Sequence, residues 1–111
     1  MMLLEPLLGS KNRERVLIFL SARKEGYARE IARFFDTSLF PIQDQLERLE
    51  TGGVIVSRQV GRTVLYQFNP RYPFLKELLA LLEKTISYYP VDMQEELLNN
   101  RRRPRRRGKP L

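Results

Sequence analysis

The sequence predicts a mainly α-helical domain that carries one small β-hairpin, an α+β fold. Apolar residues recur at helical spacing along most of the chain. Residues 54–68 are instead rich in β-branched and aromatic residues on both sides of a Gly61-Arg62 turn. With 111 residues, of which 42% are hydrophobic, the chain is long enough for one core in one domain.

The first predicted elements lie between residue 1 and Tyr27. Residues 1–9 form an apolar segment, and Ser10 suits the N-cap of a helix that runs to about Arg23. Gly26 ends that region, and Tyr27 begins a short extended link. The inner side of the helix is expected to carry Val16, Leu17, Phe19 and Leu20.

Two further helices are predicted on either side of a tight turn. The second helix covers residues 29–35, and Ser38 in the turn suits the N-cap of the third. Pro41 falls in the first turn of the third helix, where its missing N–H costs little, and Gly52-Gly53 stop the helix. Inward-facing residues are Ile31, Ala32 and Phe35 on the second helix and Ile42, Leu46 and Leu49 on the third.

The hairpin and two more helices complete the predicted body. Tyr66 and Phe68 alternate with polar residues and are expected on the buried face of the hairpin. The predicted elements are strands at 54–60 and 63–68, a proline-containing connection at 69–73, a helix at 74–89 stopped by Pro90, and a short helix within 91–100.

The order helix, helix, turn, helix, hairpin indicates a winged helix-turn-helix. The second of two helices joined by a tight turn can enter the DNA major groove, and a hairpin directly after it can touch the flanking backbone. The predicted organisation is an apolar N-terminal segment (1–9), a winged helix-turn-helix domain (10–68), a C-terminal helical dimerisation region (69–100) and a disordered basic tail (101–111).

Local residues within this order resemble a known family. Arg29-Glu30-Ile31-Ala32, then Ile42, Leu46, Leu49, Gly52 and Val54-Ile55, are similar to the winged helix-turn-helix core of ArsR/MarR-type transcriptional regulators. The resemblance implies a DNA-binding regulator. Metal-sensing ArsR members use Cys or His ligands, which this chain lacks, so the resemblance does not imply metal sensing.

A narrower resemblance covers residues 8–86. It is similar to a subgroup of stand-alone winged-helix regulators whose domain also occurs fused ahead of a small nucleotidyltransferase domain. The 111 residues leave no room for that second domain, so its activity is not expected. The matching pieces are Leu8-Gly9-Ser10-Lys11 with Arg13, Gly61-Arg62 with Tyr66, Asn69-Pro70 with Pro73, Glu77-Leu78, and Lys84-Thr85.

Candidate DNA contacts lie on the second helix, the third helix and the hairpin. By residue type, Gln43 can bond adenine, Asp44 can accept from cytosine N4, and Phe40 can pack on a thymine methyl. Arg29 at a helix start suits a phosphate, and Arg62 at the hairpin tip suits a phosphate or the minor groove. The full set is Arg29, Leu39, Phe40, Pro41, Gln43, Asp44, Arg48, Arg58 and Arg62.

Each of these candidates also has a structural interpretation. Asp44 and Glu47 place two acids on the third helix, where they repel phosphate. The alternatives are a polar turn residue for Arg62, ordinary surface for Gln43, Arg48 and Arg58, a solvated helix start for Arg29, and a ring folded back into the body for Phe40.

The helix at 74–89 has more apolar surface than one small domain can cover. One row holds Leu75, Leu79, Leu82 and Ile86, and a second holds Phe74, Leu78, Leu81 and Tyr88. A symmetric homodimer would bury the surplus, assisted by Leu3, Leu4, Leu7 and Leu8. The alternative is a larger monomer core with these N-terminal leucines as a lid. The expected dimer contacts are Leu75, Leu78, Leu79, Leu82 and Ile86.

The net charge of +7 lies entirely on the tail, because positions 1–100 hold 13 basic and 13 acidic residues. Phosphate backbone, RNA, anionic lipid or an acidic protein can attract such a tail. Its cations are Arg101, Arg102, Arg103, Arg105, Arg106, Arg107 and Lys109.

The composition argues against an enzyme. Without Cys, His or a clustered carboxylate pair, no catalytic roles can be assigned, and no metal or cofactor is expected. The chain has neither a membrane-length apolar run nor a signal-peptide pattern, so a cytoplasmic protein is expected.

The hypothesis is a dimeric, sequence-specific regulator of double-stranded DNA. The alternative is a protein- or RNA-interaction module, and the sequence identifies no small-molecule effector.

Overall fold

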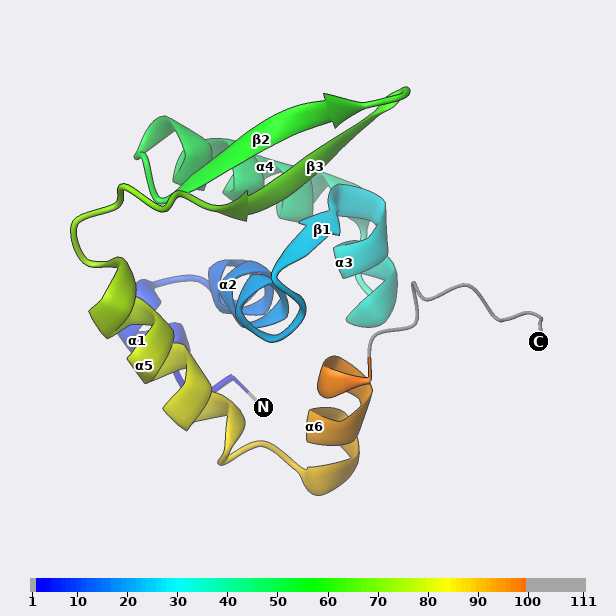
Figure 1. Cartoon of the computed structure of the whole chain (residues 1–111). Helices are drawn as coiled ribbons and strands as arrows, with labels where there is room; N and C mark the ends of the chain where they lie inside the picture. Colours follow the sequence, from blue (N-terminus) through cyan, green and yellow to red (C-terminus); the bar gives the residue numbers. More distant parts are fainter. Residues whose placement is uncertain (1, 100–111) are drawn as a thin grey trace.

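The computed structural model describes residues 2–99, and it has a winged helix-turn-helix architecture (Figure 1). The predicted helices and both hairpin strands are present, with ends that differ from the predicted ones by up to three residues. The elements are α1 (Glu5–Leu8), α2 (Lys11–Arg23), β1 (Glu25–Tyr27), α3 (Ala28–Phe34), α4 (Leu39–Thr51), β2 (Ile55–Val60), β3 (Thr63–Phe68), α5 (Leu75–Ile86) and α6 (Val91–Leu98).

Helix α2 lies at the centre of the molecule, with the other elements around it (Figure 1). Its N-cap is Ser10, as predicted, and the Ser10 hydroxyl accepts a hydrogen bond from the Arg13 N–H at 3.1 Å. The five consecutive residues 16–20 are all buried. A helical segment that is apolar on every side belongs in the middle of a core, and α2 packs against α1, α3, α4, α5, α6, β1 and β3.

The hairpin forms part of a three-stranded antiparallel sheet in the order β1-β3-β2. The extended link predicted at Tyr27 is therefore the last residue of a third strand, which pairs with β3. Strand β1 can lie this close to α2 because its central residue is Gly26. A Cβ added there would lie 2.7 Å from the Phe19 ring.

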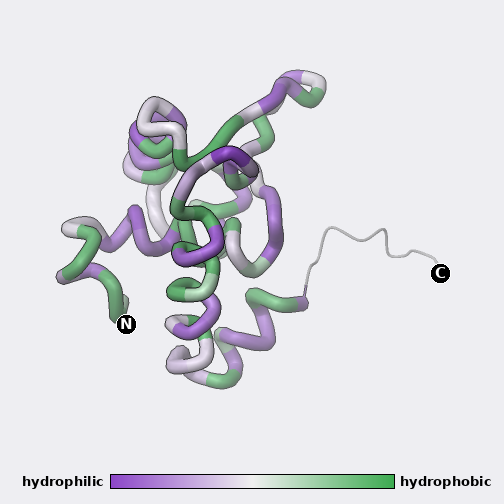
Figure 2. Tube along the Cα trace, turned by 60° about the vertical axis from the view of Figure 1, so that its left-hand side comes forward, coloured by the Kyte–Doolittle hydropathy of each residue, from purple (hydrophilic) through white to green (hydrophobic). Residues whose placement is uncertain are grey.

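The far end of the hairpin forms the wing. Gly61 turns the chain with a φ of +61°, a left-handed conformation that favours glycine. The wing extends beyond the helices in both views, and it is largely hydrophilic near its end (Figures 1 and 2).

Helices α3 and α4 form the helix-turn-helix. Ile42, Leu46 and Leu49 are buried, which confirms the predicted inner stripe of α4. Ser38 lies at the predicted N-cap of α4, but its side chain makes no capping hydrogen bond. The first backbone N–H groups of α4 are therefore not satisfied by this side chain.

The buried carboxylate of Glu14 connects both ends of the described chain to α2. Glu14 is fully buried and accepts hydrogen bonds at 2.7 Å from the Leu4 N–H and from the Tyr89 hydroxyl. Burial raises the pKa of Tyr89, and the hydrogen bond to Glu14 and the charge of that carboxylate raise it further. The hydroxyl thus remains protonated and continues to donate to Glu14 at neutral pH.

Two of the five predicted dimer contacts lie in the core of the single chain. Leu82 and Ile86 pack with α2 in the same cluster as Leu97 of α6, so they are not available to a second copy. Leu75, Leu78 and Leu79 are half-buried. The row that remains open consists of Phe74, Leu81 and Tyr88, with Phe74 62% and Tyr88 66% exposed.

The N-terminal leucines divide between the two predicted roles. Leu4 and Leu8 pack against the core, whereas Leu3 and Leu7 are exposed.

None of the helices within residues 2–99 is long and apolar enough to cross a membrane. The predicted basic tail, residues 101–111, lies outside the described residues.

Candidate nucleic-acid interface

A groove of about 320 Å³ joins the helix-turn-helix to the wing. It brings together three residues predicted from three different elements: Arg29 of α3, Gln43 of α4 and Arg62 of the wing. Its lining consists of Tyr27, Ala28, Arg29, Gln43, Glu47, Arg62, Thr63, Val64 and Tyr66. These are the elements with which a winged helix can contact a major groove and its flanking backbone.

A second hollow of about 270 Å³ lies between α3 and the start of α4. Arg29 and Arg33 line it together with Thr37 and Leu39. The N-terminus of α4 has the positive end of the helix dipole and no side-chain cap, so negative charge is favoured there. This arrangement suits a backbone phosphate of DNA.

Arg33 is a further candidate for a phosphate contact, and it is not among the residues predicted from the sequence. Its signal was the spacing from Arg29, because residues four apart share one face of a helix. Arg33 is exposed on α3, beside the turn that leads into α4.

The predicted arginines differ in whether an acid already pairs with them. The Arg48 Nε lies 3.0 Å from the Asp44 carboxylate, and an Arg58 Nη lies 3.6 Å from the Glu25 carboxylate. Within residues 2–99, neither Arg29 nor Arg62 has an acidic oxygen within 4.0 Å. Arg29 and Arg62 can therefore bind phosphate without first breaking an ion pair.

The candidate DNA contacts in the first turn of α4, Leu39, Phe40 and Pro41, differ in how far their side chains are exposed. The Phe40 ring is 75% exposed, so it does not fold back into the body. Leu39, predicted to face solvent, packs partly against the core, and Pro41 is half-buried. The prediction that Leu39 contacts DNA is therefore wrong, because a side chain held against the core has little surface left for a base.

Acidic residues occupy the second half of α4. No acid lies in its first turn, whereas Glu47 and Glu50 are exposed further along the helix. Burial raises the pKa of Tyr66, and the charges of Glu50 and Glu47 raise it further, so its hydroxyl stays protonated in the groove. Recognition helices contact bases mainly with their N-terminal residues, and that half of α4 carries no acid before Asp44.

Within residues 2–99, no group of three or more His, Cys, Asp and Glu side chains is arranged to hold a metal ion. Apart from the carboxylate of Glu47, the polar side chains that line the groove carry the guanidinium groups of Arg29 and Arg62, the amide of Gln43 and the hydroxyls of Tyr27, Thr63 and Tyr66. Such groups bind phosphate and base edges by hydrogen bonds and charge.

The fold is shared with solved structures of another protein. Two structures of a doubly substituted variant of Lactococcus lactis ZitR are similar to this chain. The apo form has a TM-score of 0.56 at 22% identity, over 86% of this chain and 87% of that chain. The other has a TM-score of 0.53 at 19% identity, over 81% of this chain and 68% of that chain.

The likeness to ZitR confirms the predicted winged helix-turn-helix fold. No protein-family model matches the sequence, and no curated protein matches it either.

Proposed function

We propose that this protein is a DNA-binding transcriptional regulator without enzymatic activity. The observation that carries the proposal is the groove in which Arg29, Gln43 and Arg62 meet. In this proposal, α4 enters the major groove with its first two turns, and the wing holds the flanking backbone. The fold and the resemblance to ArsR/MarR-type regulators support the same assignment.

The roles of the candidate residues follow from their placement. Gln43 and Phe40 read bases, because both are exposed on the half of α4 without unpaired acids. Arg29 and Arg33 bind a phosphate at the start of α4, and Arg62 binds one at the wing. Asp44 reaches a base only if its pair with Arg48 opens, so we give it and Arg48 a smaller share of the affinity.

We further propose that the regulator acts as a homodimer. The exposed row Phe74, Leu81 and Tyr88 repeats every seven residues, so these side chains lie along one side of α5 and its end. A two-fold dimer through this row presents two copies of α4 to a roughly symmetric DNA site. The basic tail adds affinity that does not depend on sequence.

Selection of genomic DNA fragments by the purified full chain, followed by sequencing, tests the proposal. We expect enrichment of a defined site. Gln43→Ala and Phe40→Ala should each weaken binding to that site by about 1–3 kcal/mol more than binding to random DNA. Equal losses on both DNAs would show that α4 is not the reader, and no enriched site would overturn sequence-specific binding.

The acids of α4 favour a second candidate function, a protein- or RNA-interaction module. Glu47 lines the groove and Glu50 is exposed near it, and both carboxylates repel a phosphate backbone but suit a basic partner. Gel shifts with the full chain and with a chain ending at Asn100 separate the two functions. Binding that is blind to sequence and disappears with the tail would favour the interaction module.

A further inference from the structure

Arg23 is a buried cation at the junction of three helices. It is the last residue of α2, and it is only 8% exposed, so it has almost no surface with which to contact DNA itself. A buried charge is costly unless hydrogen bonds and an opposite charge compensate it. The groups that compensate Arg23 therefore show which parts of the molecule this residue holds together.

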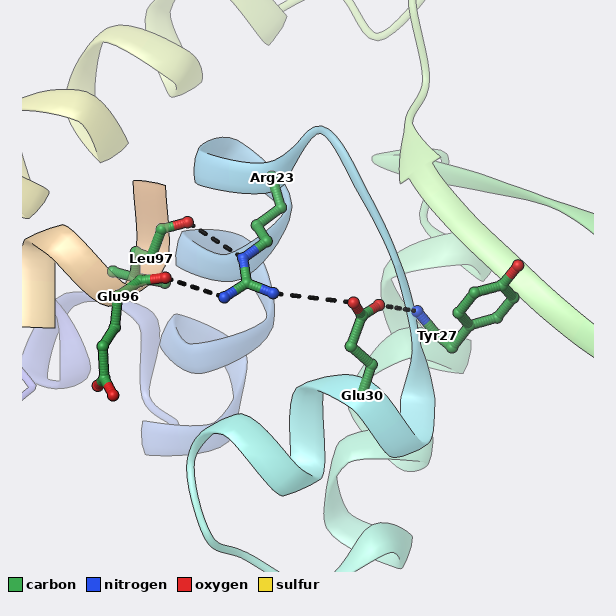
Figure 3. Close-up of polar contacts among 5 residues, drawn as sticks. All are labelled: Arg23, Tyr27, Glu30, Glu96 and Leu97. Atoms are coloured by element: carbon green, nitrogen blue, oxygen red, sulfur yellow. Dashed lines mark hydrogen bonds and ion pairs between the residues drawn. The ribbon is translucent and has the colours of Figure 1, made fainter. Parts of the chain in front are cut away.

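The end of α6 fixes the guanidinium of Arg23 from one direction. The Arg23 Nε donates to the Leu97 carbonyl at 3.1 Å, and one Nη donates to the Glu96 carbonyl at 2.9 Å (Figure 3). The last carbonyls of a helix have no partner within the helix, and a cation there complements the negative end of the helix dipole. These two hydrogen bonds fix the direction in which the guanidinium points.

Helix α3 contacts the same guanidinium through two residues four positions apart. The second Nη lies 3.8 Å from one Glu30 oxygen, and the centre of the guanidinium lies 5.3 Å from the ring centroid of Phe34. Residues four apart lie on one side of a helix, so Arg23 contacts α3 along one side. The other Glu30 oxygen accepts a hydrogen bond from the Tyr27 N–H at 3.2 Å, which also fixes the start of α3 (Figure 3).

The orientation of α3 depends on such contacts because the helix is short. It has seven residues, of which only Ile31 and Ala32 are buried. A helix of this length is not stable by itself, and its tertiary contacts decide where it lies. The ion pair and the ring contact of Arg23 add to the two buried side chains and help to set the orientation of α3.

The arginines of α3 lie next to the residues that Arg23 contacts. Arg29 directly precedes Glu30, and Arg33 directly precedes Phe34. Both arginines are exposed and line the hollow between α3 and the start of α4. Arg29 also lines the groove that joins the helix-turn-helix to the wing. A shift of α3 would therefore move both arginines relative to a bound phosphate backbone.

We propose that Arg23 is a positioning residue, which orients α3 so that Arg29 and Arg33 bind phosphate while α4 lies in the major groove. The inference rests on the proposed function. Arginine suits this role because its planar fork reaches two carbonyls and a carboxylate from one group, whereas lysine is a point charge. Glu30 shares the role, because its carboxylate connects the guanidinium to the start of α3.

Two double-mutant cycles on the selected DNA site test this inference. One combines Arg23→Lys with Arg29→Ala on α3, and the other combines Arg23→Lys with Arg62→Ala on the wing. The factor by which Arg29→Ala lowers affinity should be at least about threefold smaller in the Arg23→Lys background than in the wild type, because coupled residues are not additive. The factor for Arg62→Ala should be the same in both backgrounds, because Arg62 shares no partner with Arg23 among the described residues.

Tyr89→Phe is the matched control for a general loss of stability. Tyr89 is buried, and its hydroxyl donates to Glu14 in the first turn of α2, at the opposite end of that helix from Arg23. The factor for Arg29→Ala should therefore be unchanged in the Tyr89→Phe background. Circular dichroism melting shows that each variant is folded at the temperature of the binding measurement.

An equal factor for Arg29→Ala in the wild type and in Arg23→Lys would overturn the inference and leave the proposed function intact. An equal reduction of the Arg29 and Arg62 factors would also overturn it, because the effect would then not be specific to α3. If Arg23→Lys does not fold, Glu30→Gln replaces it in both cycles with the same expectations. The amide oxygen can still accept from the Tyr27 N–H, but it no longer neutralises Arg23.

Two further outcomes concern the proposed function. An Arg29→Ala variant that binds the selected site as tightly as the wild type would remove the phosphate contact at Arg29 and the inference with it. A full chain that binds no DNA would remove both the proposed function and the inference.

Discussion

Single side chains on the proposed DNA face differ most in whether their charge is already neutralised. Arg62 at the end of the wing has no acidic oxygen within 4.0 Å among the described residues, whereas Arg58 on the same hairpin is paired with Glu25. A phosphate group can bind Arg62 without displacing an acidic side chain, whereas at Arg58 it has to compete with the carboxylate of Glu25. Two arginines four residues apart in the sequence are thus expected to have different functions.

Arg62→Ala should lower affinity for specific and random DNA by a similar factor. Loss of one phosphate contact should also flatten the slope of log affinity against log salt by about 0.9. Arg58→Ala is the matched control and should change the slope less. Fluorescence anisotropy across a salt series measures both, and a larger effect at Arg58 would contradict the assignment.

Buried Tyr89 makes stability depend on pH in the alkaline range. The pKa of the folded Tyr89 hydroxyl is raised by burial and by Glu14, whereas the unfolded value is about 10. The stabilisation is therefore fully present below pH ~10. It is lost as pH rises further, because only the unfolded chain releases the proton.

Tyr89→Phe should cost about 1–3 kcal/mol at neutral pH, because Glu14 loses a donor. Above pH ~10 its free energy of unfolding should fall less steeply with pH than that of the wild type, by up to about 1.4 kcal/mol per pH unit. Urea denaturation across this range measures the difference. Tyr88→Phe, an exposed neighbour, is the control and should follow the wild type.

Two charged residues escaped prediction because charge usually indicates the surface. Glu14 and Arg23 are both buried. Leu4 and Glu30 compensate them from nearby in the sequence, but their other partners, Tyr89 for Glu14 and the carbonyls of Glu96 and Leu97 for Arg23, are more than 70 positions away. No local pattern in the sequence reports such partners. Phe40, in contrast, was left open between two orientations, and the structure resolves it as exposed.

At the scale of elements, the helices and the hairpin could be predicted because their signals are local. Ser10, Gly52-Gly53 and Gly61 mark ends and turns that the structure reproduces. Strand β1 could not be predicted as a strand, because its three residues are extended only through pairing with β3. Which face of α5 packs on α2 depends on where α2 lies in the fold, and the sequence of α5 alone does not show this. Leu82 and Ile86 were therefore predicted as dimer contacts, but they pack in the core of the single chain.

The exposed row of α5 gives the prediction at this scale. Combining Phe74→Ser with Tyr88→Ser should convert a dimer to a monomer with little change in melting temperature, because neither side chain is buried. Multi-angle light scattering measures the mass. Val91→Ser, equally exposed but on α6, is the control, and a monomeric wild type at high concentration would rule out the dimer.

For the whole molecule, the excess positive charge lies on the tail and not on the body. We therefore expect the tail to supply affinity for any DNA and the body to supply sequence preference. Positions 1–100 are formally neutral, so the full excess of +7 belongs to residues 101–111. A chain that ends at Asn100 should keep its fold and its preferred site, because the reading residues lie on α4. Its affinity for every DNA should fall by a similar factor.

The salt dependence of the truncated chain should also be weaker, by up to about 0.9 in slope per lost phosphate contact. Competition binding with specific and random duplexes measures both quantities. A changed site preference after truncation would show that the tail reads sequence, for example through arginines in a narrow minor groove.

The central position of α2 has a consequence for hydrogen exchange. Since residues 16–20 of α2 are buried among the other elements, we expect their amides to reach solvent only when the whole domain unfolds. The end of the wing is covered by no helix, so its amides can open locally at a small free-energy cost. The wing can thus adjust its shape to a DNA backbone while the core that positions α4 stays closed.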